Sequence, residues 1–161
     1  MKLKFFALLA AMTTILFSTF TCFASNNNPL AGSEPANPHE SISTIGSGEK
    51  AQYGIVNAVV GISYNPSKNN ISFNFITRAT HVSSQIGMGY FALEKWNANA
   101  QRWDAVLAGP EYATNLINHS ASYTYNNVTR NAYYRVTGTH YAKINGTGYS
   151  MYNETNYIYT N

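Results

Sequence analysis

The sequence predicts an all-β domain, an antiparallel β-sandwich of about seven strands that follows a disordered linker. Three observations predict this fold class. The chain is rich in tyrosine, asparagine, threonine and serine, a mixture that favours strands and turns over helices. Strand-like runs recur at short spacing, separated by turn residues. No segment keeps a helical period over a window of about 11 residues.

Residues 1–24 are expected to be a secretory signal peptide rather than part of the domain. Lys2 and Lys4 form a positive end, an apolar stretch covers residues 5–17, and Ala24 marks the cleavage site. An uncleaved membrane anchor is the alternative, but the apolar stretch is shorter than the ~20 residues that a spanning helix needs. We therefore expect a secreted, extracellular protein with no stable membrane span after cleavage.

Cleavage changes both the charge and the cysteine content. The full chain has 10 basic and 7 acidic side chains, so the loss of Lys2 and Lys4 lowers the net charge from +3 to about +1. The remaining basic residues are scattered, and we expect no nucleic-acid partner. Cys22, the one cysteine, is also removed. The domain is therefore no disulfide scaffold, which fits export from a bacterial cell.

Residues 25–52 are expected to form a flexible linker, and the folded domain is expected over residues 53–161. Three of the five prolines lie in the linker, among few large apolar residues. The alternative is that Ile42 and Ile45 add an edge strand to the sandwich. The domain, of about 110 residues, is long enough to bury a core of its own.

The first two strands are expected over residues 53–64 and 70–75, joined by a turn. The first is apolar and rich in β-branched residues, with a bend expected at Gly61. The second alternates strictly between apolar and polar side chains, which is typical of a half-buried strand. Its apolar face holds Ile71, Phe73 and Phe75.

The third and fourth strands are expected over residues 87–96 and 102–108, joined by a hairpin loop. In the third strand, Phe91 and Leu93 are expected to face the core. The outward side chains of that strand are expected to be Tyr90, Glu94 and Trp96.

The chain is expected to leave the sheet at Gly109-Pro110, because proline cannot donate to a strand ladder. Residues 111–118 are then expected to be irregular, with Leu116 and Ile117 as an apolar plug. A fifth strand is expected over residues 119–125, where hydroxyl side chains alternate with alanine and tyrosine.

Residues 132–143 are expected to form the central strand. One face carries every charged side chain of this stretch, so the opposite face is expected to face the core. The core face holds Tyr134, Val136, Gly138, His140 and Ala142. The dipeptide Asn145-Gly146 predicts a tight hairpin turn, after which a last strand is expected to return over residues 147–160.

From Val128 the chain resembles the fibronectin type III signature Leu-x-Pro-Gly-Thr-x-Tyr-x-Val. The pattern here is Val-x-Arg-Asn-Ala-x-Tyr-x-Val, with Arg130 and Asn131 in place of the usual proline and glycine. A second departure is that phenylalanines occupy the early strand where the family has a core tryptophan. The resemblance implies an immunoglobulin-like or fibronectin type III-like sandwich in which the hydroxyl of Tyr134 bonds the preceding backbone. A signal, a polar spacer and a lone sandwich are also similar to small secreted proteins of Gram-positive bacteria whose function is unassigned.

The sequence lacks enzyme motifs, and we expect no catalytic residues, no cofactor and no metal site. The four histidines lack metal-ligand spacing, and His140 is expected to be buried and hydrogen-bonded. Glu94 and Asp104 lie on strands joined by one loop, and a glycosidase needs two facing carboxylates. The favoured alternative is that Glu94 pairs across the sheet with Arg102 or Arg135.

An aromatic outer face is the feature that suggests a function. If the third, central and last strands are neighbours, as the resemblance implies, their outward side chains form one surface that suits sugar rings or a partner protein. The predicted binding residues are Tyr90, Trp96, Tyr133, Arg135 and Tyr141. We therefore expect a secreted, non-enzymatic binding or adhesion module for a cell-surface glycan or a protein. The competing explanation is that the tyrosines only stabilise exposed strands.

A secreted toxin or bacteriocin-like effector that acts on membranes is the alternative function. Low charge, no mature cysteine and many strands permit it, and residues 147–160 form the segment that would enter a membrane. Leakage from liposomes would favour the effector, and its absence would favour the binding module. If the binding module is right, the double substitution Tyr133→Ala and Tyr141→Ala abolishes binding and leaves the fold intact.

Overall fold

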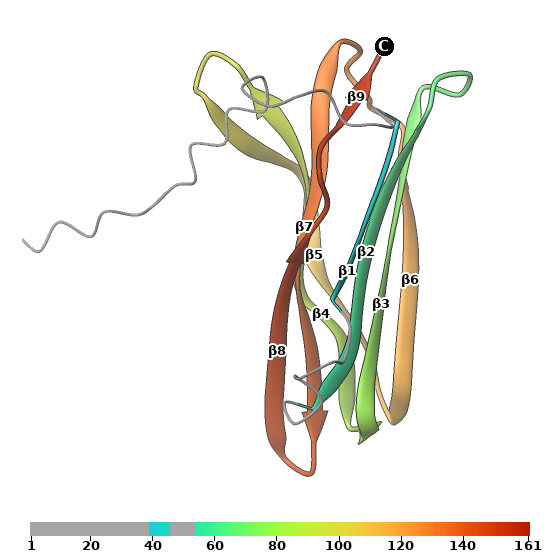
Figure 1. Ribbon diagram of the computed structural model, residues 1–161, viewed down its shortest axis with the longest axis vertical. Helices are drawn as coiled ribbons and strands as arrows, with labels where there is room; N and C mark the ends of the chain where they lie inside the picture. The colour runs from blue at the N-terminus through green and yellow to red at the C-terminus, as the bar shows by residue number, and fades with distance from the viewer. Residues whose placement is uncertain (1–38, 46–53) are drawn as a thin grey trace, which may run out of the picture.

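The computed structural model describes residues 39–45 and 54–161, which form nine β-strands in two antiparallel sheets (Figure 1). The described chain is therefore an all-β sandwich, as predicted. Most of the predicted linker and the whole predicted signal peptide lie outside the described residues. The strands are β1 (Glu40–Ile45), β2 (Ile55–Asn65), β3 (Asn70–Ser83), β4 (Gln85–Asn97), β5 (Arg102–Ala113), β6 (Leu116–Tyr125), β7 (Ala132–Ile144), β8 (Thr147–Glu154) and β9 (Ile158–Thr160).

The strand order places β7 at the centre of one sheet. The first sheet has the order β1-β2-β3-β6, and the second has the order β5-β4-β7-β8, with β9 also paired to β7. β7 pairs with β4 along one side and with β8 and then β9 along the other. The predicted adjacency of the third, central and last strands is therefore confirmed. Figure 1 shows the two sheets running together along the long axis of the molecule.

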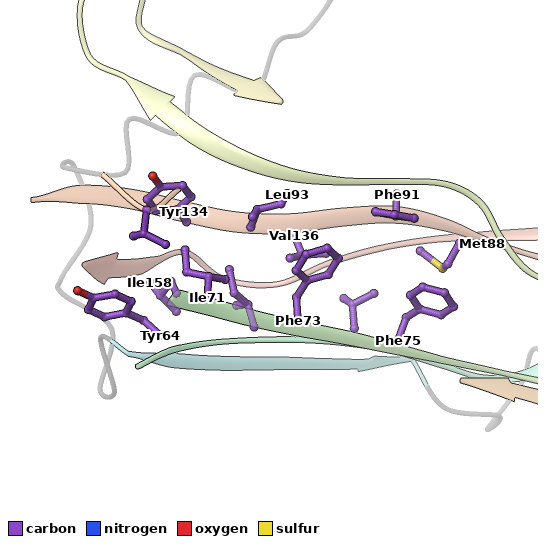
Figure 2. Packing of buried hydrophobic residues seen from close by; sticks show 13 residues of the cluster. Tyr64, Ile71, Phe73, Phe75, Met88, Phe91, Leu93, Tyr134, Val136 and Ile158 are labelled. Atoms are coloured by element: carbon purple, nitrogen blue, oxygen red, sulfur yellow. The ribbon is translucent and has the colours of Figure 1, made fainter. Parts of the chain in front are cut away.

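The core lies between the sheets and follows the predicted alternation. On β7, Tyr134, Val136 and His140 are each at most 2% exposed. Figure 2 shows side chains from the two sheets meeting in one layer, with those of β3 opposite those of β4 and β7. The buried side chains predicted on β3 are confirmed as Ile71, Phe73 and Phe75.

A group of aromatic rings fills part of this layer. The rings of Phe91 on β4 and Phe73 on β3 come from opposite sheets, and their centroids lie 5.8 Å apart. Tyr123 on β6 packs against both, at 4.9 Å from Phe91 and 5.1 Å from Phe73. Its hydroxyl donates to the carboxylate of Glu111 on β5 at 2.8 Å. Burial, together with this hydrogen bond, raises the pKa of Tyr123 to about 12.

The hydroxyl of Tyr134 holds the chain where it enters β7. The backbone N–H of Thr129 donates to this hydroxyl at 2.9 Å, and the ring is fully buried. The corner contact that the resemblance implied is therefore confirmed. Asn131, at the glycine position of the signature, has a φ of 55°, a left-handed conformation that asparagine tolerates better than most residues.

β1 corrects the prediction of a linker without structure in this region. It pairs along β2 from Glu40↔Ser63 to Ile45↔Ala58, so the alternative of an edge strand is what forms. Asn153 on β8 ties this edge to the other sheet. Its amide donates to the carbonyls of Ser43 at 3.3 Å and Ala58 at 3.0 Å, and its oxygen accepts from the Ser43 hydroxyl at 2.7 Å.

β5 continues through Gly109-Pro110 to Ala113, so the prediction that the strand ends at the proline is wrong. Pro110 is tolerated because β5 is an edge strand, paired only with β4. It also lies where the register between β4 and β5 shifts. A proline at such a position interrupts no regular ladder.

β6 begins at Leu116, earlier than predicted, and the proposed apolar plug does not exist. The side chains of Leu116 and Ile117 are 42% and 44% exposed. The physical reason is a shift of register between β3 and β6 after Arg78, which detaches this end of β6 from the regular face alternation. The predicted alternation along the rest of the strand is confirmed.

The last strand is divided into β8 and β9, where the sequence predicted one continuous strand. Asn145 and Gly146 form the predicted tight turn, with φ angles of 49° and 83°. Thr155 interrupts the ladder but stays bonded to Val136 of β7. Its N–H donates to the Val136 carbonyl at 2.9 Å, and its hydroxyl accepts from the Val136 N–H at 3.0 Å. The threonine hydroxyl therefore replaces a backbone carbonyl at the break.

His140 is buried and hydrogen-bonded, as predicted. Its Nδ1 lies 2.7 Å from the hydroxyl of Thr77 on β3, and that hydroxyl donates to the Gly87 carbonyl at 3.0 Å. With the hydroxyl proton used in this way, the Nδ1–H of His140 donates to the Thr77 oxygen. Burial lowers the pKa of His140 to about 4, so the ring is neutral at physiological pH.

The corner contact of Tyr134 can be tested by removing its hydroxyl. We expect Tyr134→Phe to lower the free energy of unfolding by about 1 kcal/mol, because the Thr129 N–H loses its acceptor while the ring stays packed. Tyr134→Ala should cost about 3–5 kcal/mol, because it also opens a cavity. Urea titration followed by circular dichroism measures both losses. Tyr90→Phe, on the exposed face, is the matched control, and an equal loss there would refute the corner role.

The burial of His140 predicts a specific loss of stability in acid. The pKa is near 6.5 in the unfolded chain and about 4 in the fold, so between these values the unfolded state binds a proton that the native state refuses. Stability should therefore fall as the pH drops through this window, by at most about 1.4 kcal/mol per pH unit. Urea titrations at several pH values should show that this acid-dependent loss of stability disappears in His140→Gln. The same loss should remain in the control His81→Gln, because the side chain of His81 is exposed.

Candidate functional site

All five predicted binding residues lie on the outer face of the β5-β4-β7-β8 sheet. Phe91 and Leu93 of β4 and Tyr134 of β7 point into the core, so the alternate side chains of these strands point outward. We call this surface the aromatic face. Its aromatic and charged members are Tyr90, Glu94, Trp96, Trp103, Tyr112, Tyr133, Arg135, Tyr141, Lys143, Tyr152, Glu154 and Tyr159.

Arg135 is the centre of the charge network on the aromatic face. Its Nε donates to Glu94 at 2.7 Å, because the two residues are directly opposite in the β4–β7 ladder. Its Nη1 donates to Glu154 at 3.3 Å, and its Cζ lies 4.6 Å from the ring centroid of Trp103. The favoured pairing of Glu94 with an arginine across the sheet is therefore confirmed for Arg135.

The second carboxylate expected near Glu94 has partners of its own. Asp104 accepts from Asn97 at 2.7 Å and from Arg102 at 2.8 Å. These two hydrogen bonds lower the pKa of Asp104, that of Asn97 most strongly. The carboxylates of the hairpin are therefore engaged in pairs with basic or amide groups rather than facing each other.

The two tryptophans of the chain meet at one end of the aromatic face. Trp96 and Trp103 are opposite in the β4–β5 ladder, and their rings contact edge to face with centroids 5.4 Å apart. Both are half-buried. Trp103 was not among the predicted site residues, although the hairpin loop after Trp96 would have placed the two opposite each other.

Tyr133 and Tyr141 point outward, as predicted, but neither ring stands free. Tyr133 contacts the rings of Tyr157 and Tyr159, with centroids 5.3 Å and 4.9 Å apart. Tyr141 contacts the ring of Tyr112 edge to face at 5.9 Å. Both are half-buried, so truncating them disturbs neighbouring rings as well as any binding surface.

Tyr90 and Tyr152 are the rings that project most freely from the aromatic face, at 51% and 56% exposed. Both are opposite Thr139 of β7, Tyr90 from β4 and Tyr152 from β8. Two strand spacings therefore separate their backbones, about 10 Å. The Tyr152 hydroxyl donates to Glu154 at 2.7 Å, and partial burial with this hydrogen bond raises the pKa of Tyr152 above its ordinary value.

Sequence reasoning found Tyr90 but missed Tyr152 and Glu154. The alternation of the last strand places both on one face, and the tight turn at Asn145-Gly146 sets the register that brings them beside β7. The aromatic face therefore offers two exposed rings, a threonine hydroxyl between them and a carboxylate held in place. Such a set can stack on an apolar ring face and accept hydrogen bonds.

The Arg135 network should stabilise the fold more than an ordinary surface ion pair. The side chains of Arg135 and Glu94 are only 23% and 18% exposed, so Arg135→Met leaves a half-buried carboxylate without its partner. We expect a loss of about 1–3 kcal/mol in the free energy of unfolding, measured by urea titration. Arg102→Met is the control, because Arg102 is 70% exposed in its pair with Asp104 and should change stability by less than about 0.5 kcal/mol. Equal losses in the two variants would contradict the central role of Arg135.

No helix in the described ranges has the length and apolar character to cross a bilayer. Within the same residues, no group of three or more His, Cys, Asp and Glu side chains could hold a metal ion. Compared with protein-family models, with curated proteins and with solved structures, the chain matches none of them.

Proposed function

We propose that this protein is a secreted, non-enzymatic binding module that recognises a cell-surface glycan through the aromatic face. The observation that carries the proposal is the pair of exposed rings, Tyr90 and Tyr152, on either side of Thr139. Sugars present apolar C–H faces beside hydroxyl groups. An aromatic ring next to hydrogen-bonding groups is complementary to that pattern.

The charge network favours a neutral or weakly charged glycan over a strongly anionic ligand. The guanidinium of Arg135 is already bonded to Glu94 and Glu154 and packs on Trp103. An anionic ligand would have to compete with two carboxylates for it. The carboxylate of Glu154, by contrast, can accept further hydrogen bonds from sugar hydroxyls.

Rigid strands support the proposed site. The exposed rings lie on β4 and β8. β8 pairs with β7 through an unbroken ladder, and β4 pairs with β7 through a ladder that has one register shift, between Met88 and Tyr90. A binding surface built on such strands loses little conformational entropy when a ligand is bound. A binding surface carried by paired strands suits an adhesion module that recognises a repeating polymer.

We also propose that the domain is fibronectin type III-like within the broader immunoglobulin-like class. Two features support this: the corner hydrogen bond of Tyr134, and the division of strands into β2-β3-β6 and β5-β4-β7-β8. In immunoglobulin-like lettering these correspond to A-B-E and C′-C-F-G. In this scheme β1 is an additional edge strand beside β2.

The glycan proposal can be tested by tryptophan fluorescence. Both tryptophans lie on the aromatic face, so a bound oligosaccharide should change their emission. We expect hits on a glycan array to be reproduced by titration with the corresponding soluble oligosaccharide. Tyr90→Ala with Tyr152→Ala should weaken binding by about tenfold or more, with an unchanged circular dichroism spectrum.

The matched control removes exposed apolar side chains elsewhere. Ile42 and Val82 are 65% and 62% exposed and lie on the other sheet. The double variant Ile42→Ala and Val82→Ala should bind like the parent. Undiminished glycan binding by the tyrosine variant would refute the site. Binding to a protein, with no response to any glycan, would refute the ligand class.

A further inference from the structure

From Asn118 to Tyr125, β6 differs from the other edge strands in having no feature that blocks pairing with another chain. Natural edge strands are protected by charges, prolines, irregular pairing or short length. In the described sheets, β5 carries Pro110 and three charged residues, β8 is interrupted at Thr155, and β1 is short and begins with Glu40. β6 has ten residues, from Leu116 to Tyr125, with no proline and no Lys, Arg, Asp or Glu.

The backbone of β6 pairs regularly with β3 from Asn118 to Tyr125. Its ladder with β3 runs without a break from Arg78↔Asn118 to Ile71↔Tyr125. In an antiparallel strand paired on one side, alternate residues point their N–H and C=O groups away from the sheet. Figure 1 shows β6 at the margin of the molecule. Within the described part of the chain, β6 has β3 as its one strand partner, so these groups are open to another strand.

The side chains of β6 are complementary to a second, antiparallel copy of the same strand. A two-fold axis at Ala121 would place residues whose numbers sum to 242 opposite each other, with Ser120 and Ser122 as the one identical pair. Ser120 would then be opposite Ser122 of the second copy, and Asn118 opposite Thr124. These four side chains are exposed on the outer face of the sheet, where hydroxyl and amide pairs form favourable cross-strand hydrogen bonds.

The same pairing would cover an exposed apolar side chain. Ile117 would lie opposite Tyr125 of the second copy, and Ile117 is 44% exposed. The contact would be repeated at the other end of the paired strands by symmetry. A two-fold, self-complementary arrangement of this kind is the commonest form of homodimer interface.

We propose that two copies of this chain associate through antiparallel pairing of their β6 strands about Ala121, which joins the two β1-β2-β3-β6 sheets into one continuous sheet. The aromatic face belongs to the other sheet, so each copy would keep it free. The dimer would thereby present two such faces to one surface. The pairing is independent of what the aromatic face binds.

The proposal can be tested by placing like charges at the centre of the strand. Ser120 and Ser122 are exposed, so Ser120→Lys with Ser122→Lys should leave the monomer folded, as checked by circular dichroism. In the dimer the lysines would be directly opposite each other. Sedimentation of the purified protein over a concentration series should show a monomer–dimer equilibrium for the parent. The dissociation constant should rise about tenfold or more in the lysine variant.

A mixing experiment provides the matched control. Ser120→Glu with Ser122→Glu should also be monomeric, but an equimolar mixture of the lysine and glutamate variants should recover a heterodimer. Amide exchange should show added protection of β6 in the parent at high concentration and not in either variant alone. A parent that stays monomeric at every concentration would overturn the proposal. So would two variants that dimerise as the parent does, or a mixture that stays monomeric.

Discussion

The rest of the structure depends on the register of β7, and the chain enters that strand at the hydrogen bond from the Thr129 N–H to the Tyr134 hydroxyl. This hydrogen bond anchors the chain at the start of β7. β4, β8 and β9 all pair with β7. A shift of one residue would turn Tyr133 and Arg135 into the core and Tyr134 and Val136 into solvent. Since one buried face and one charged network both depend on this register, the register is strongly specified.

The two faces of β7 have separate roles because they meet different environments. Inward, the strand packs against β2 and β3, and the Nδ1 of His140 is hydrogen-bonded to Thr77 within the core. Outward, Arg135 connects β4 to the β8 side of the sheet through two carboxylates. The inner face therefore supplies stability, and the outer face supplies a rigid surface with aromatic rings. Recognition can change on that surface with little effect on the core.

The two proposals use different sheets, which makes them compatible. Glycan recognition is assigned to the sheet that contains β7, and self-pairing to the edge of the sheet that contains β3. A dimer with two free aromatic faces would bind a repeating surface polymer with an effective concentration set by the dimer itself. Modest affinity at each face would then suffice for adhesion. In this arrangement, the β6 strand, which lacks Lys, Arg, Asp and Glu, would form the dimer, and the exposed rings of Tyr90 and Tyr152 would bind the glycan in each copy.

The sequence by itself determined the fold class, the buried face of β3 and both faces of β7, because alternation and turn chemistry are local signals. The corner role of Tyr134 followed from the resemblance to the fibronectin type III signature. The sequence also identified five residues of the aromatic face. Only the tertiary structure decided that β1 forms, that β5 continues past Pro110 and that Leu116 and Ile117 are exposed. Each of these depends on a partner strand distant in sequence or on a register shift, which no local pattern encodes. The same holds for Tyr152 and Glu154, whose place beside Arg135 follows from the pairing of β8 with β7.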